Sequence, residues 1–271
     1  MRFPDDLPAK ATGAAHAAAG AASDAAHAAA GAATVAAYAA ADAATGAAHA
    51  AAGAAVSAAS LVKPRLRGVF HQYCFFISLI GGTGLVLASP TGRAQAASAV
   101  YAAALTGLFG SSALYHRVTW SPAARRWMRR LDHSMIFVLI AGTYTPFAVL
   151  IASGTQRLAV LAAVWGAALL GALLRLFWID APKWVSVALA FAMGWLVVGS
   201  TPGLALQTGP AAVFLIVLGG VLYSIGALVY AFRRPNPAPA VFGYHEVFHA
   251  CVCAAAAAHF ATIAFFVIPR G

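Results

Sequence analysis

The stretch GYHEVFHACVCAAAAAHF, residues 243–260, opens the last apolar segment of the chain and also contains a cluster of ionisable side chains. With the residues that follow, it is long enough to cross a bilayer, since about 20 apolar residues span the hydrocarbon core. Ionisable side chains at membrane depth are costly and usually functional. We therefore expect His245, Glu246 and His249 to have partners elsewhere in the chain.

The composition indicates an integral membrane protein. Of 271 residues, 62% are hydrophobic and 9% are charged, which is more apolar surface than a soluble domain of this size can bury. The three cysteines, Cys74, Cys251 and Cys253, lie in apolar segments, and their odd number argues against a disulfide framework.

Apolar segments long enough to cross a membrane recur from residue 69 onward. They predict an all-α fold, a seven-transmembrane helix bundle formed by residues 63–271. The expected spans are residues 69–89, 94–115, 131–151, 156–176, 184–201, 210–231 and 243–268.

Basic residues are distributed unequally between alternate ends of these spans. One side holds Lys63, Arg65, Arg67, Arg117, Arg125, Arg126, Arg129, Arg130, Arg175, Lys183, Arg233 and Arg234. The other side holds Arg93, Arg157 and Arg270. The positive-inside rule then predicts a cytoplasmic N-terminus and an outside C-terminus. Because the basic residues form short clusters between apolar segments rather than one continuous face, we expect no nucleic-acid partner.

Residues 1–62 form a separate low-complexity extension rich in alanine, glycine and histidine. Four tandem 11-residue units over residues 13–56 place His16, His27, Tyr38 and His49 at one phase. Eleven residues make almost three helical turns, so these rings would share one side of a helix. The extension is either a surface-lying or self-associating helix, or a marginal and mostly disordered segment.

The seven-span arrangement brings polar side chains from distant segments to one depth. His116 ends the second span, Asp132 begins the third, and His245 and His249 begin the seventh, all on the cytoplasmic side. A spacing of four residues leaves His245 and His249 about 40° apart on one helix face. Ser112 and His116 have the same spacing.

Three neutral imidazoles with one open position are typical of a catalytic zinc site. We therefore interpret His116, His245 and His249 as ligands of Zn²⁺, with Asp132 as the base and Ser112 hydrogen-bonded in the same network. Taken singly, each histidine is also compatible with an interfacial side chain, and Asp132 with a helix N-cap or a salt bridge.

HEVFH, residues 245–249, also matches the HExxH signature of zinc proteases, in which the glutamate is the general base. This alternative is weaker, because no acidic third ligand follows Glu246 in the chain, and His116 and Asp132 would have no role. Instead of acting as a general base, Glu246 is expected to face the headgroups or the arginines of the preceding loop.

Three segments resemble the haemolysin III family, the bacterial branch of the progestin and adiponectin receptor (PAQR) superfamily. They are GSSALYHR (110–117), RRLDHSMIFVLIAGTYTPF (129–147) and residues 243–260. The resemblance extends from Pro64 to Ile268. It implies seven membrane helices with a cytoplasmic N-terminus, zinc held by His116, His245 and His249, and Ser112 and Asp132 beside them.

Relatives of this superfamily are linked to ceramide hydrolysis and membrane-lipid homeostasis. We therefore expect a zinc-dependent hydrolase of a lipid amide or ester in the bacterial cytoplasmic membrane, with Asp132 and Ser112 as catalytic residues and membrane lipids as its partners. The alternative is a receptor, or a pore-forming, lytic protein, in which zinc is structural. Protein partners cannot be inferred from the sequence.

The charge distribution generates a test of topology. Alkaline phosphatase, which is active only outside the cytoplasm, is expected to be active when fused after Thr91 or after Gly271, and inactive after Asp180. Enzyme activity in cells expressing each fusion measures this directly. Inactive enzyme at Gly271 would contradict an odd number of spans.

Overall fold

The computed structural model describes residues 8–61, 63–200 and 207–271. The regular elements of this part of the chain are all helices, and it has no β-strand, only an isolated bridge between Ala238 and Phe242, so the all-α prediction is confirmed there. Its internal contacts divide the chain into two units, Met1–Val62 and Lys63–Gly271.

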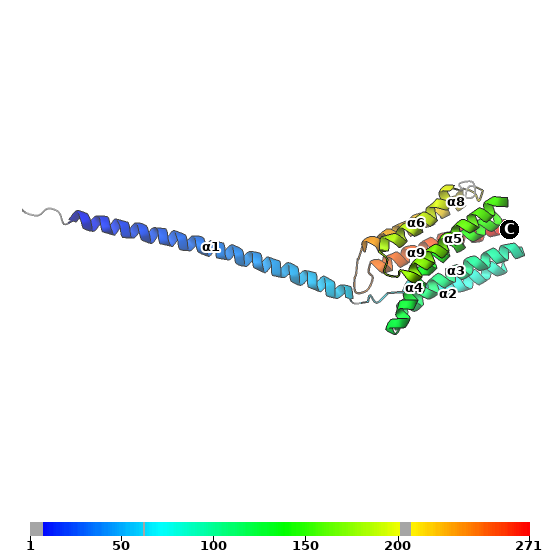
Figure 1. Ribbon diagram of the computed structural model, residues 1–271, viewed down its shortest axis with the longest axis horizontal. Helices are drawn as coiled ribbons and strands as arrows, with labels where there is room; N and C mark the ends of the chain where they lie inside the picture. Colours follow the sequence, from blue (N-terminus) through cyan, green and yellow to red (C-terminus); the bar gives the residue numbers. More distant parts are fainter. Residues whose placement is uncertain (1–7, 62, 201–206) are drawn as a thin grey trace, which may run out of the picture. The chain divides into compact units, whose positions relative to one another are not determined.

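The first unit contains one long helix, α1 (Pro8–Leu61), which Figure 1 shows as a continuous coil. Side chains from His16 to Ala52 are exposed, so the described part of this helix has no core of its own. Its alanine content favours helix formation without tertiary packing, because alanine has the highest helix propensity.

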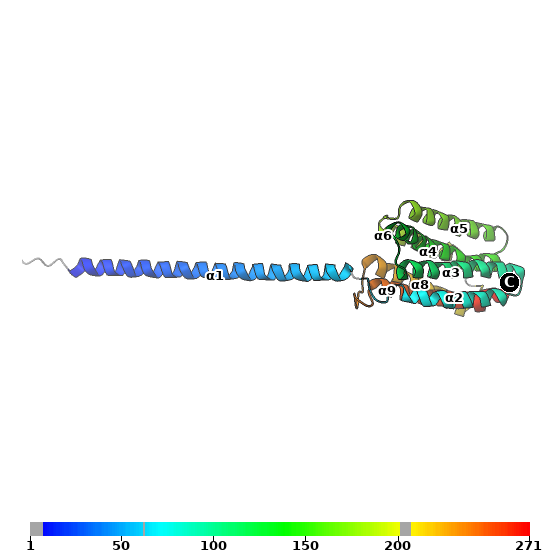
Figure 2. The ribbon, with the colours of Figure 1, turned by 90° about the horizontal axis from the view of Figure 1, so that it is seen from below.

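The second unit is a bundle of helices that run alongside one another in both views (Figures 1 and 2). These helices are α2 (Val69–Leu87), α3 (Gly92–Arg117), α4 (Pro122–Leu150), α5 (Gly154–Phe177), α6 (Lys183–Ser200), α8 (Pro210–Phe232) and α9 (Tyr244–Thr262). After α9 the chain continues as a π-helical turn, Ile263–Val267, and a 3₁₀ turn, Ile268–Arg270.

Six helices of the described chain are long and apolar enough to cross a membrane: α2, α3, α4, α5, α8 and α9 with its terminal turns. The fifth predicted span, residues 184–201, corresponds to α6, whose apolar stretch is shorter, Trp184–Trp195. Residue 201 lies outside the described residues. Candidate membrane-spanning helices are thus present, while a count of seven and their orientation stay predictions.

Helix α4 begins nine residues earlier than the predicted third span. The Ser121 hydroxyl accepts a hydrogen bond from the Ala124 amide at 3.3 Å, and Pro122 occupies the first helical position, which together start a helix. The arginine-rich stretch that follows continues the helix, since arginine is a good helix former. Asp132 therefore lies inside α4 rather than at its N-cap.

The core of the bundle lies around α3, which is the most buried of the six candidate spans. In its most apolar 18-residue stretch, 61% is buried. It packs against α2 on one side and α4 on the other. Small residues allow the close approach: a Cβ added to Gly142 of α4 would lie 2.5 Å from the Ala104 Cβ of α3. Large apolar side chains such as Ile80 and Phe177 point outward and are exposed, which is typical of a lipid-facing surface.

The contact between α3 and α4 generates a test of packing. Gly142→Ala is expected to push the two helices apart and to destabilise the bundle by about 1 to 3 kcal/mol. Gly166→Ala is the matched control, because no atom lies within 4 Å of its added Cβ. Thermal unfolding in detergent measures both, and equal melting temperatures for the two variants would contradict the close packing.

Candidate metal centre

Three histidines from two distant segments converge at one end of the bundle. His116 is in the last turn of α3, and His245 and His249 are in the first turns of α9. One ring nitrogen from each lies within 4.8 Å of those of the other two, and all three side chains are buried. The Nε2 atoms of His116 and His245 are 3.1 Å apart. We call this end of the bundle the histidine end.

The backbone at the start of α9 places two of these rings on one face. Gly243 is the N-cap, and its amide donates a hydrogen bond to the Glu246 carboxylate at 2.8 Å. His245 and His249 follow one turn apart, as their spacing predicts, and their ring centroids are 4.5 Å apart.

A glycine before α2 leaves room for the third ring. Gly68 has a positive φ of 81°, and a Cβ at this position would lie 2.5 Å from the His116 Cβ. Any larger residue would therefore strain the backbone and press on the end of α3.

Asp132 and Ser112, the predicted catalytic pair, lie beside the histidines. The Asp132 Oδ2 atom is 3.8 Å from His116 Nε2, and the Ser112 side chain is a hydrogen-bond partner of Asp132. Both side chains are buried and both line the cavity described below. The structure thus brings a carboxylate and a hydroxyl against the histidine cluster, although their catalytic roles stay predictions.

Glu246 lies elsewhere than the sequence predicted. It is fully buried and forms an ion pair with Arg67, which precedes α2, rather than facing headgroups or the arginines of the preceding loop. A buried carboxylate requires such a partner. Because its other oxygen accepts the Gly243 amide, Glu246 is engaged in holding the start of α9, which disfavours the general-base role of an HExxH protease.

His71 also lies at the cluster, although its place near the start of the first span favours a solvated interfacial side chain over one that supports the site. Only 3% of it is exposed, and its ring stacks on His249 at a centroid distance of 3.7 Å. Neither ring nitrogen has a hydrogen-bond partner within the described residues. The available signal was its place near the start of the first span, at the depth of the other histidines.

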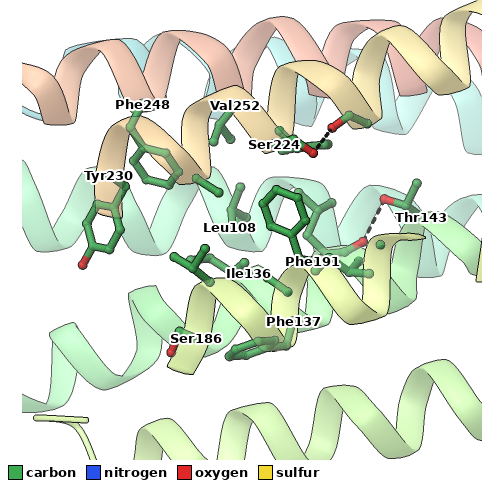
Figure 3. A pocket seen from close by; sticks show the side chains of 18 of the residues that line it. Leu108, Ile136, Phe137, Thr143, Ser186, Phe191, Ser224, Tyr230, Phe248 and Val252 are labelled. Atoms are coloured by element: carbon green, nitrogen blue, oxygen red, sulfur yellow. Dashed lines mark hydrogen bonds between the residues drawn. The ribbon is translucent and has the colours of Figure 1, made fainter. Parts of the chain in front are cut away.

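A cavity of about 230 Å³ extends from this cluster into the bundle. Figure 3 shows Leu108, Ile136 and Phe191 at its walls, with Tyr230 and Ser186 at one end and Thr143 and Ser224 at the other. His259, which lies deeper in α9, lines this cavity, and its Nε2 atom lies 3.2 Å from the Ile216 carbonyl oxygen.

The donor set fits a divalent metal ion that prefers nitrogen ligands. Three buried imidazoles, a nearby carboxylate and a hydroxyl match the composition of catalytic zinc sites. The mainly apolar cavity that adjoins them can hold a hydrophobic chain next to this centre.

Comparison with known proteins places this chain among haemolysin-III-related proteins, whose family profile matches residues 59–260. A hemolysin-3 homolog of Bacillus subtilis is 31% identical over 169 residues, covering 62% of this chain and 76% of the relative. Hemolysin-3 of Bacillus cereus is 30% identical over 187 residues, covering 68% of this chain and 82% of the relative. The resemblance seen in the three sequence segments is thereby confirmed, and the chain belongs to the haemolysin-III-related family.

Proposed function

We propose that this protein is a zinc-dependent hydrolase that cleaves an amide or ester bond of a membrane lipid. The observation that carries the proposal is the contact of a buried three-histidine cluster with a buried carboxylate at the end of a largely apolar cavity. A soluble substrate would not require such a cavity, whereas a lipid brings its scissile bond and its acyl chain together.

His116, His245 and His249 would hold the metal ion. Zn–N distances of about 2.0 to 2.1 Å in a tetrahedral site place ligand nitrogens about 3.4 Å apart, close to the 3.1 Å between the Nε2 atoms of His116 and His245. When bound, Zn²⁺ supplies Lewis acidity that polarises a carbonyl group and acidifies water.

The remaining groups of the site have separable roles in this proposal. Asp132 would accept a proton from the attacking water and return it to the leaving group, which is the role of a general acid–base. Ser112 would orient Asp132 through its hydrogen bond. The apolar walls of the cavity would bind an acyl chain and exclude bulk water from the reacting bond.

We propose that the metal centre lies at the cytoplasmic face of the bacterial cell membrane. Seven spans with α6 as the fifth would put the histidine end at the cytoplasmic face of the bacterial cell membrane, where the basic residues are concentrated. At this depth the centre lies close to lipid headgroups. An amide or ester near the headgroup therefore suits its position.

A second candidate is a lytic protein or a receptor in which the metal ion is structural. It is favoured by the name hemolysin-3, which the curated relatives bear. In this case the ion would tie α3 to α9 and need no open position. A closed site with a fourth protein ligand would distinguish it.

Metal binding is tested by the stoichiometry of the purified protein. We expect about one zinc ion per chain by inductively coupled plasma mass spectrometry, because three clustered imidazoles form a high-affinity site. His249→Ala is expected to lose most of this zinc. His259→Ala, on the same helix but bonded to the Ile216 carbonyl, is the control and should retain it. Equal zinc content in both variants would exclude the cluster as the metal site.

Hydrolysis is tested with the Asp132→Asn variant, which keeps the shape of the side chain and removes the base. We expect the release of fatty acid from lipid amides or esters, followed by mass spectrometry, to fall by about 10²- to 10⁴-fold while zinc content is unchanged. Equal rates in wild type and variant, or none in either, would refute the hydrolase. Lysis of liposomes that persists in His116→Ala would show that the lytic activity needs no metal site.

A further inference from the structure

Arg175 is a buried cation at the histidine end with incomplete bonding. It lies in the last turn of α5, with 4% of its surface exposed. Its Nη1 atom donates a hydrogen bond to the Ile179 carbonyl at 3.3 Å, while its Nε atom is buried and has no partner within the described residues. From the sequence alone, Arg175 is one of the basic residues that predict the topology.

The bundle offers Arg175 no carboxylate. Residues 63–271 contain three acidic side chains, Asp132, Asp180 and Glu246. Asp180 pairs with Arg129 at 2.9 Å, and Glu246 pairs with Arg67. Asp132 is at the histidine cluster, hydrogen-bonded by Ser112. Each acid of this unit is therefore committed to another group.

An arginine in this position is costly unless something compensates for it. The guanidinium group stays protonated in proteins, so it cannot escape burial by becoming neutral. A buried charge without a partner is strongly destabilising. A single backbone carbonyl offsets only part of this cost, so an anion bound from outside the bundle would stabilise Arg175.

The surroundings of Arg175 show where such an anion would bind. Arg175 lines the cavity that leads to the metal centre, and so does Ser186, whose buried hydroxyl also has no partner within the described residues. Figure 3 shows Ser186 and Tyr230 at the same end of this cavity, and the charge of Arg175 is close enough to Tyr230 to interact with it. The Tyr230 ring lies 5.7 Å from the His245 ring, so one aromatic side chain separates this end from the histidines.

From this geometry we infer that Arg175 and Ser186 form a phosphate subsite. This inference rests on the proposed function, because it names the substrate class of the same site. The substrate would be a lipid whose headgroup carries a phosphate, held so that its acyl bond reaches the histidine cluster. A guanidinium fork suits phosphate oxygens, and a hydroxyl adds a further donor. In a glycerophospholipid the phosphate and an acyl ester are attached to neighbouring carbon atoms. This short separation matches the arrangement here, in which only the Tyr230 side chain separates the phosphate subsite from the histidine cluster.

Binding, rather than turnover, is the appropriate readout. The full chain carrying Asp132→Asn, which leaves the ligand intact, is purified in detergent and titrated by calorimetry. The probes are dioctanoyl phosphatidic acid, dioctanoylglycerol with the same chains and no phosphate, and sodium phosphate. We expect phosphatidic acid to bind at least about tenfold more tightly than dioctanoylglycerol, the equivalent of one charge-assisted hydrogen bond.

Arg175→Met and Ser186→Ala, each in this background, test the two residues. Arg175→Met is expected to abolish the preference for phosphatidic acid without lowering the melting temperature of the ligand-free protein, since it removes an uncompensated buried charge. Ser186→Ala, which removes only a hydroxyl group, should reduce the preference several-fold. Arg126→Met is the matched control, because it changes an exposed arginine at the same end of the bundle. This variant should keep the preference for phosphatidic acid.

The outcomes separate this inference from the hydrolase. A preference for phosphatidic acid that survives both Arg175→Met and Ser186→Ala would overturn the subsite. Equal binding of the two lipids by the protein with Arg175 and Ser186 intact would also overturn it. Sodium phosphate that displaces phosphatidic acid completely at micromolar concentration would support the phosphate subsite but assign it to the free ion. An Arg175-dependent preference in a protein that hydrolyses no lipid would retain the subsite and refute only the hydrolase.

Discussion

A polar group buried in an apolar helix bundle must find a partner, and this constraint organises the histidine end. Glu246 is fully buried and paired with Arg67 from the segment before α2, while its second oxygen caps α9. Asp132 is held by Ser112 and approaches His116. These contacts link the segment before α2 with α3, α4 and α9, so the partners that satisfy buried charge also bring the three imidazoles together.

The same constraint identifies where a ligand belongs. Most buried polar atoms in a folded protein are hydrogen-bonded, so those left without partners need an explanation. Among the described residues such atoms include the His71 ring nitrogens, His249 Nδ1 and Arg175 Nε, and all three of these residues line one cavity. A metal ion would bind the imidazoles and a polar headgroup would pair with Arg175, while an acyl chain would fill the apolar cavity. A lipid substrate would therefore use more of this end than a structural metal alone.

Periodicity and charge predicted much of the bundle, because helix length and apolar composition are local properties. The spacing of His245 and His249 placed their rings on one face, and the depth of His116 brought it to the same level. Partners distant in sequence could not be read in this way. The pairing of Glu246 with Arg67, the burial of His71 against His249, and the isolation of Arg175 depend on how α2, α5 and α9 pack. The early start of α4 had a local signal, Ser121 followed by Pro122, which hydropathy alone does not register.

The central claim is that three imidazoles hold one divalent metal ion at the histidine end, and X-ray absorption spectroscopy of the purified protein at the zinc edge tests it most directly. If the histidines hold the ion, the spectrum is expected to show three imidazole nitrogens at about 2.0 to 2.1 Å, with a further light atom completing four-coordination. A sulfur scatterer at about 2.3 Å would mean cysteine ligation, and Cys74, Cys251 and Cys253 would then hold the metal instead of the histidines. Such a spectrum, or one without imidazole scattering, would show that the three histidines do not hold the ion.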